Sequence, residues 1–245
     1  MPEDDDRKSG PTVISDDFAS QVTSIAALAE PVRRDLYQFV ASQTEPVSRE
    51  RAAAGVGVAQ HVAKFHLDKL VDDELLEFEF RRPPGRRGPG AGRPSKVYRR
   101  SDREVAVSLP ERHYELAGRL LAEAVTRSQL EGESVAGGLR NAAQATGRSF
   151  AERILERTGH KAGQTKLLKA VIAELEGQGY EPRREPNGII MGNCPFHSLA
   201  AEYTDLVCGM NLDIMHGLVD CLEGSGLEAK LDPVEGQCCV RLQEQ

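Results

Sequence analysis

All five cysteines of this 245-residue chain lie between residues 194 and 239, and the first 193 residues contain none. They are Cys194, Cys208, Cys221 and the adjacent pair Cys238 and Cys239. Thiols gathered in one segment are typical of a site that binds a metal, because soft thiolate ligands select zinc or iron–sulfur clusters. The cysteine segment is therefore predicted to hold one of these two groups.

The spacing of the thiols limits which of them can share one ion or cluster. Residues 198–222 are predicted to be helical, and along one continuous helix Cys208 and Cys221 would lie about 20 Å apart. Both can be ligands only if the helix breaks, at Gly209 or Gly217 for example. Cys221 is therefore predicted to be a buried free thiol, a common environment for unpaired cysteine.

Cys238 and Cys239 fall on a predicted strand, in which neighbouring side chains point to opposite faces. One member of the pair is therefore expected to be a ligand. The candidate ligands are then Cys194, Cys208 and one of Cys238 and Cys239, with His197, Cys221, solvent or a small molecule as the fourth. The paired Cys-x-x-Cys motif of close zinc sites is absent, and the long spacers fit an iron–sulfur site at least as well as zinc.

A strongly basic segment indicates what the cysteine site regulates. Residues 81–100 contain seven arginines and one lysine without an acidic residue, a charge of +8. Since the whole chain carries −7, the remaining residues carry −15. Such asymmetry is typical of an acidic body with one basic segment that binds an anionic partner, and a solvated loop is the alternative.

The elements around the basic segment predict a winged helix-turn-helix. Apolar residues at helical spacing predict short helices from residue 19 onward, with an interruption at Glu30-Pro31. Ser48 is a good N-cap for the next short helix. A glycine turn at 55–58 then precedes a longer helix at 59–73. In this arrangement the second helix enters the major groove of DNA. Alternating segments at 75–80 and 95–99 predict two strands joined by the basic loop, which together form a wing.

Residues of the second helix and of the wing are candidates for DNA contacts. Gln60, His61 and Lys64 lie at the N-terminal end of the helix, off its apolar face, and are predicted to contact base edges, whereas His66 is predicted to pack within the domain. The basic residues of the wing are expected to contact phosphates or the minor groove. They are Arg81, Arg82, Arg86, Arg87, Arg93 and Lys96.

Two stretches carry a resemblance to a known family. They are Phe65 to Leu76 (FHLDKLVDDELL) and Gly92 to Tyr98 (GRPSKVY), which resemble the winged-helix domain of the bacterial ArsR-like repressors. The resemblance covers roughly residues 19–100, and the wing here is longer and richer in arginine than is usual in that family. It implies a winged-helix fold and binding to double-stranded DNA.

The rest of the chain predicts long helices followed by a small α+β domain. Helices at 111–129 and 133–157 contain small residues at which another helix can approach, either within the domain or in a partner chain. A dimer interface is favoured because winged helices generally bind symmetric half-sites as pairs. A helix at 165–176, a hairpin around Pro186-Asn187-Gly188 and a last strand at 238–242 follow. The predicted fold class is α+β, mainly helical. The expected regions are a disordered acidic lead-in (1–18), a winged helix-turn-helix domain (19–105), a helical dimerisation region (106–160) and a cysteine-rich sensor domain (161–245).

The whole layout resembles the iron–sulfur-sensing repressors of the Suf cluster-assembly operon, which place a winged helix first and end in a cysteine domain that begins with Cys-Pro. Cys194, Cys208 and Cys238 fall on that pattern. The family's remaining cysteine would fall near Leu227, so Cys221 comes several residues too early. The resemblance implies an iron–sulfur cluster of the [4Fe–4S] type as the cofactor.

Together these features predict a cytoplasmic, homodimeric transcription regulator whose affinity for an operator is controlled by an iron–sulfur cluster. The polar N-terminus shows no export signal and no apolar run approaches the roughly 20 residues of a membrane helix, so no membrane partner is expected. No catalytic triad, phosphate loop or pair of catalytic carboxylates is evident, so an enzyme is not expected. The alternatives are a zinc-binding or thiol-redox-sensing regulator and, in another class, a metal-handling or RNA-binding accessory protein.

Overall fold

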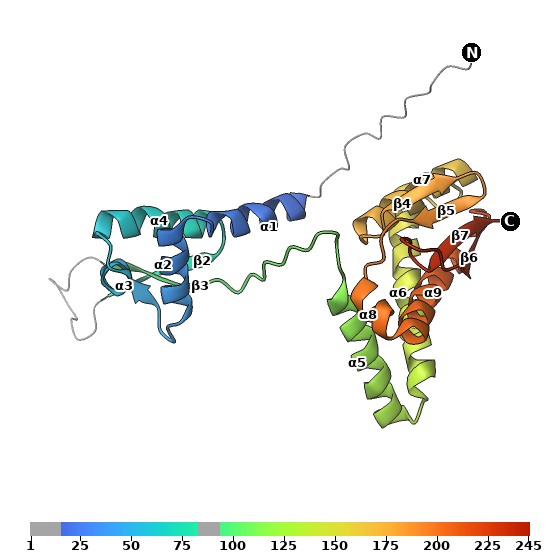
Figure 1. Cartoon of the computed structure of the whole chain (residues 1–245), viewed down its shortest axis with the longest axis horizontal. Helices are drawn as coiled ribbons and strands as arrows, with labels where there is room; N and C mark the ends of the chain where they lie inside the picture. The colour runs from blue at the N-terminus through green and yellow to red at the C-terminus, as the bar shows by residue number, and fades with distance from the viewer. Residues whose placement is uncertain (1–15, 83–93) are drawn as a thin grey trace, which may run out of the picture. The chain divides into compact units, whose positions relative to one another are not determined.

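The computed structural model describes residues 16–82 and 94–245, and in these residues the fold is α+β and mainly helical, as predicted. The chain forms two compact units, which divide between Val107 and Ser108 (Figure 1). This division lies two residues from the expected boundary after residue 105. None of the helices in the described residues is long and apolar enough to cross a membrane.

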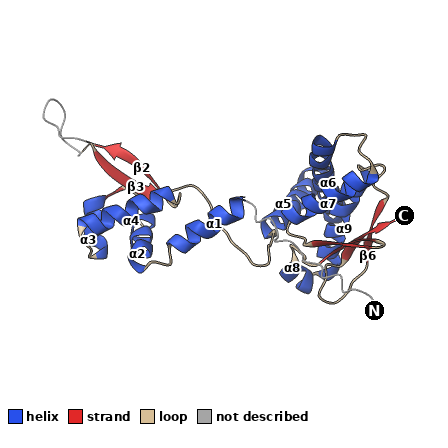
Figure 2. Cartoon of the chain, turned by 90° about the horizontal axis from the view of Figure 1, so that it is seen from above, coloured by secondary structure: helices blue, strands red, loops and turns tan. Residues whose placement is uncertain are grey.

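The N-terminal unit is a small helical domain with a three-stranded antiparallel sheet in the order β1-β3-β2. Figure 2 shows the longer strands β2 and β3 side by side. Its elements are α1 (Asp16–Ala27), α2 (Pro31–Ala41), β1 (Val47–Ser48), α3 (Arg49–Val56), α4 (Gln60–Asp72), β2 (Leu76–Arg81) and β3 (Ser95–Arg100). Strands β2 and β3 pair with Phe78 opposite Tyr98, which confirms the predicted hairpin. Leu36, Leu67 and Leu70 are fully buried beneath it.

Local sequence features fix the ends of these helices. Pro31 begins α2, and the carboxylate of Glu30 accepts a hydrogen bond from the backbone N–H of Arg33 at 2.6 Å. The hydroxyl of Ser48 caps α3 in the same way. Gly57 ends α3 with φ +75°, a left-handed conformation that glycine adopts without steric cost. The predicted helix, glycine turn and helix are all present.

The C-terminal unit packs helices against a four-stranded antiparallel sheet in the order β4-β5-β7-β6. Its elements are α5 (Tyr114–Glu131), α6 (Val135–Thr158), α7 (Gln164–Gly177), β4 (Pro182–Glu185), β5 (Gly188–Met191), α8 (His197–Glu202), α9 (Thr204–Asp220), β6 (Leu227–Leu231) and β7 (Val240–Glu244). The hairpin expected around Asn187 is the β4–β5 pair. One apolar core runs through this unit, from α5 and α6 to β7.

Helices α6 and α9 approach each other backbone to backbone. A Cβ atom on Gly147 of α6 would lie 1.9 Å from the carbonyl oxygen of Ile214 in α9, so glycine is required there. Because α6 is part of this core, the expected boundary after residue 160 falls inside one compact unit. The role of residues 106–160 in dimerisation stays a prediction.

Two predicted elements of this unit differ from the structure. The helical stretch expected at 198–222 is two helices, α8 and α9, which are separated at Tyr203, and α9 continues unbroken through Gly209 and Gly217. The strand expected to begin at Cys238 begins at Val240, because Cys238 and Cys239 belong to the preceding loop.

Candidate functional site

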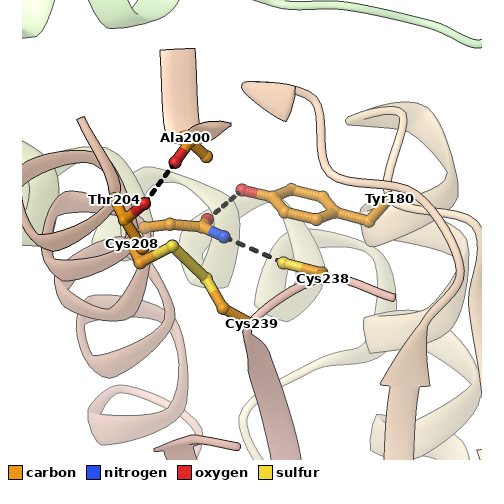
Figure 3. The surroundings of a disulfide bond; sticks show 7 residues. Tyr180, Ala200, Thr204, Cys208, Cys238 and Cys239 are labelled. Carbon is orange, nitrogen blue, oxygen red and sulfur yellow. Dashed lines mark hydrogen bonds between the residues drawn. A yellow bond between two sulfur atoms is a disulfide. The ribbon is translucent and has the colours of Figure 1, made fainter. Parts of the chain in front are cut away.

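Four cysteines meet beside α9. Cys208 lies in this helix and forms a disulfide with Cys239, with a Cα–Cα distance of 6.4 Å (Figure 3). Cys238 precedes Cys239 in the loop before β7 and accepts a hydrogen bond from the α9 residue Asn211. The expectation that the adjacent pair points to opposite faces is therefore wrong: since neither residue lies in the strand, both sulfurs turn toward α9.

Cys194 joins this group through Cys238. Both thiols are buried, and they share a hydrogen bond in which Cys238 donates. That bond, with smaller contributions from the backbone N–H of Phe196 and the charge of Arg112, lowers the pKa of Cys194 to about 7 against the opposing effect of burial. The same pairing, together with burial, raises the pKa of Cys238 well above its ordinary value. The pairing therefore favours ionisation of Cys194 over ionisation of Cys238.

Arg112 and Asn193 hold the turn that carries Cys194. Arg112 Nη1 donates to the carbonyl oxygen of Cys194 at 3.2 Å and also to Oδ1 of Asn193. The amide of Asn193 donates in turn to the carbonyl oxygens of Glu111 (3.0 Å) and Gly179 (2.6 Å). These contacts fix the turn and place a cation close to the Cys194 sulfur.

The two other candidate ligands, Cys221 and His197, have exposed side chains. Cys221 caps the C-terminal end of α9 and is exposed, so the prediction of a buried thiol is wrong. Because α9 is unbroken, Cys221 lies about 20 Å along the helix from Cys208. The side chain of His197 is exposed at the start of α8, while its backbone N–H donates to the carbonyl oxygen of Cys194 at 3.1 Å.

The chemistry of the donor set suits a soft metal or an iron–sulfur cluster only after reduction. Among the residues that the structure describes, no group of three or more His, Cys, Asp or Glu side chains is arranged to hold a metal ion. Two of the four sulfurs are joined as a disulfide, and a disulfide supplies no thiolate. Reduction would give four neighbouring thiols, of which Cys194 has a lowered pKa.

On the N-terminal unit, the predicted base-contacting residues form an exposed edge of α4. Gln60, His61 and Lys64 are all exposed. Phe65, the next residue along the helix, is also 66% exposed although it is a large apolar side chain. His66 is turned inward, with Nδ1 3.5 Å from both Glu30 Oε2 and Arg33 Nε, so its predicted packing within the domain is confirmed.

Lys96 joins the wing to α4. Its Nζ lies 2.5 Å from Asp68 Oδ1 and 4.1 Å from the centre of the Phe78 ring. Tyr98 donates to the same Asp68 oxygen at 3.2 Å, and burial together with the charge of Asp68 raises the pKa of Tyr98 well above its ordinary value. The contacts of Lys96 are therefore within the domain, and its predicted DNA contact stays untested.

The other basic residues of the wing fall into two groups. Arg81 is paired with Glu79 and with Glu45, the latter at 3.3 Å, while Arg82 is exposed. Arg86, Arg87 and Arg93 lie outside the described residues.

A comparison with known protein families settles the nature of the N-terminal unit. Residues 28–77 match the family described as a helix-turn-helix domain. This segment is a helix-turn-helix domain. A comparison with curated proteins and one with solved structures give no match.

The match runs from the residues before α2 to the start of β2 and includes α4, which takes the place of the recognition helix. Strands β2 and β3 follow α4 as a hairpin, in the position of a wing. A domain of this kind marks the protein as a DNA-binding transcription regulator. The exposed edge of α4 is therefore the expected face toward DNA.

Sequence reasoning missed Phe65, Asn211, Tyr180 and Arg112. Phe65 is an apolar residue off the apolar stripe of its helix, which is a detectable feature. Asn211 stands between Met210 and Leu212 in an apolar helix, and a lone amide in such a segment also indicates a special partner. The contacts of Tyr180 and Arg112 join distant segments, and no sequence pattern marks them.

Proposed function

We propose that this transcription regulator holds an iron–sulfur cluster of the [4Fe–4S] type and that the cluster controls its affinity for operator DNA. The observation that carries the proposal is the meeting of Cys194, Cys208, Cys238 and Cys239 in a chain whose N-terminal unit contains a helix-turn-helix domain. Cys194 and Cys208 are proposed as ligands together with one of Cys238 and Cys239. His197 or an exogenous group is left as the fourth, because Cys221 lies about 20 Å along the unbroken helix α9 from Cys208.

When bound, an iron–sulfur cluster supplies a redox-active group whose gain or loss can report iron, oxygen or nitric oxide. The residues of this chain hold the sulfurs in place. Arg112 and Asn193 position Cys194, α9 positions Cys208, and the loop before β7 positions the adjacent pair. In the structure, two thiols of this group, Cys208 and Cys239, are joined as a disulfide.

For the cluster to control DNA affinity, the protein must have two conformations that bind the cluster with different affinities. Helix α9 carries Cys208 and is packed on α6 through Gly147 and Gly217. A shift of α9 on cluster binding would therefore be passed to α6 and to α5, which packs against it. In a homodimer that pairs through these helices, this shift would respace the two helix-turn-helix domains.

An exposed apolar group supports pairing through the α5–α6 hairpin. Val125, Leu130 and Val135 are 44%, 81% and 43% exposed around its turn. Exposed apolar side chains on a helical hairpin are available for an interface between chains. A cytoplasmic homodimer on a two-fold symmetric operator is the proposed assembly.

The disulfide itself favours a second candidate, a thiol-redox regulator that acts without metal. In that case the switch is the reversible bond between Cys208 and Cys239, beside the hydrogen-bonded pair Cys194 and Cys238. A zinc-binding regulator would use the reduced thiols in the same way.

Purification without oxygen separates these candidates. A brown protein that contains iron and acid-labile sulfide, loses both when Cys194 or Cys208 is replaced by Ser, and retains both in the matched Cys221→Ser variant supports the cluster. A colourless protein with one zinc per chain, or with no metal, contradicts it. Operator sequences selected from random DNA duplexes then allow a test of the proposed regulation. If the cluster-loaded and cluster-free proteins bind the operator with equal affinity, the cluster does not control DNA binding.

A further inference from the structure

Asn211 is a side-chain amide with no exposed surface, in the middle of α9. A buried amide is costly unless both its oxygen and its nitrogen find hydrogen-bond partners. The Oδ1 atom accepts from the hydroxyl of Tyr180 at 2.6 Å, and Nδ2 donates to the sulfur of Cys238 at 3.2 Å (Figure 3). The amide is thus a bridge between a buried phenol and one particular thiol.

Tyr180 decides which way this amide faces. Its side chain is buried, and burial, followed by the nearby sulfurs of Cys238 and Cys194, raises the pKa of Tyr180 well above 10.0. The hydroxyl therefore keeps its proton and acts as the donor. An amide turned the other way would place its N–H groups against this donor and its oxygen against the sulfur, so Tyr180 directs the N–H toward Cys238.

The two members of the adjacent cysteine pair are held differently. Cys238 is buried, its backbone N–H donates to the carbonyl oxygen of Met191 at 2.9 Å, and its thiol is shared with Cys194. Cys239 is half-buried and is bonded to Cys208. An N–H donor directed at sulfur stabilises negative charge on it, as a metal-bound thiolate requires.

We propose that Asn211, oriented by Tyr180, is the positioning residue that makes Cys238, and not Cys239, the ligand from the adjacent pair. For the nature of the bound group the inference rests on the proposed function. The fixed placement of Cys238 also leaves Cys239 as the thiol that Cys208 takes when the site is empty and oxidised. Hydrogen bonds to ligand sulfurs raise the reduction potential of an iron–sulfur cluster, so Asn211 also makes the bound cluster easier to reduce.

Three variants of the full chain test this inference. Asn211→Leu keeps the size of the side chain and removes both hydrogen bonds, Tyr180→Phe keeps the ring and removes the orienting hydroxyl, and Cys221→Ser changes an exposed thiol as the matched control. Each cluster-free protein is reduced and then reoxidised with oxidised glutathione, which accepts the two electrons released as a disulfide forms. The disulfide bonds are then identified by mass spectrometry. The wild type and the control should give the Cys208–Cys239 bond, while the first two variants should give Cys208–Cys238 in comparable amounts.

The cluster-loaded protein gives a second readout. Cys238→Ser should fail to take up iron and sulfide, whereas Cys239→Ser should load like the wild type. In Asn211→Leu the equilibrium constant for one-electron reduction should fall roughly tenfold, which corresponds to about 59 mV. Loading of Cys238→Ser with failure of Cys239→Ser overturns the inference, and so does an unchanged disulfide map in both Asn211→Leu and Tyr180→Phe. A wild type that takes up no cluster overturns the proposed function instead, and the disulfide map still decides the role of Asn211.

Discussion

The carbonyl oxygen of Gln144 in α6 faces Gly217 in α9 so closely that a Cβ atom on Gly217 would lie 2.1 Å from it. The reciprocal contact, between Gly147 and the carbonyl oxygen of Ile214, is equally tight. The two helix backbones therefore touch directly, one turn apart. This contact ties the helix that carries Cys208 to the longest helix of the unit.

We predict that Gly217→Ala destabilises the C-terminal unit by about 1–3 kcal/mol or more, because the added methyl group meets backbone that cannot turn away. Urea unfolding of the reduced protein measures the loss. Gly209→Ala is the matched control in the same helix, since a Cβ there meets nothing within 4 Å. It should stabilise the protein by about 0.4–1 kcal/mol, as glycine removal from a helix generally does. Equal stability of the two variants would contradict the packing.

The parts of the fold that follow from the sequence depend on short-range interactions. Pro31, Ser48 and Gly57 each act on the turn in which they lie, and the alternation in β2 and β3 is a local pattern. The DNA-binding half was therefore predictable nearly to the residue. Within that half, the contact of Lys96 with Asp68 was not predictable, because it joins residues 28 positions apart.

The cysteine site was predictable in composition but not in arrangement. Clustering along the sequence selected the segment in which four cysteines lie close together. The pairing of Cys208 with Cys239 and of Cys194 with Cys238 depends on how α9, β5 and β7 pack, and no local pattern encodes that packing. Cys221 was misplaced for the same reason, since its exposure follows from where α9 ends on the surface.

Substitutions on the exposed edge of α4 should separate base contacts from backbone contacts. Gln60→Ala or His61→Ala is expected to cost about 1–3 kcal/mol of operator binding and to relax selectivity at particular base pairs. Arg82→Ala should weaken binding to all duplexes alike and reduce the slope of log K against log salt by about 0.9. Binding titrations at several salt concentrations distinguish these outcomes. If all three variants lose the same affinity for every duplex sequence, Gln60 and His61 do not contact bases.

Phe65→Ala should change DNA binding without changing the fold. The side chain is 66% exposed, so its removal should alter the free energy of unfolding by less than about 0.5 kcal/mol. If it contacts a thymine methyl group, the variant should lose about 1 kcal/mol of operator binding and become insensitive to replacement of thymine by uracil. Loss of stability without loss of affinity would place Phe65 in a packing role.

The lowered pKa of Cys194 predicts a pH dependence of stability in the reduced, metal-free protein. Its folded pKa of about 7 lies below the ordinary 9.0, so between these values the unfolded chain binds more protons than the native one. Stability should therefore rise as the pH increases from 7 toward 9, by at most about 1.4 kcal/mol per pH unit, and be lost as the pH falls through 7. Urea midpoints at pH 6, 7 and 8 measure this. Cys238→Ala removes the principal hydrogen bond and should flatten the dependence; an equal slope in both proteins would argue against the pair.

Reduction of the disulfide should lower the stability of the cluster-free protein. The bond between Cys208 and Cys239 joins residues 31 positions apart, and closure of a loop of that length in the unfolded chain is worth about 3–4 kcal/mol. Dithiothreitol should therefore lower the thermal midpoint of the wild type. The Cys239→Ser variant should already melt at this lower temperature and should not respond to dithiothreitol.

Addition of iron and sulfide to the reduced wild type should restore the lost stability, because a ligand that binds the native state alone stabilises it. Zinc that restores it equally well, with no uptake of sulfide, would favour the zinc-binding regulator, since zinc would then bind the reduced thiols proposed for the cluster.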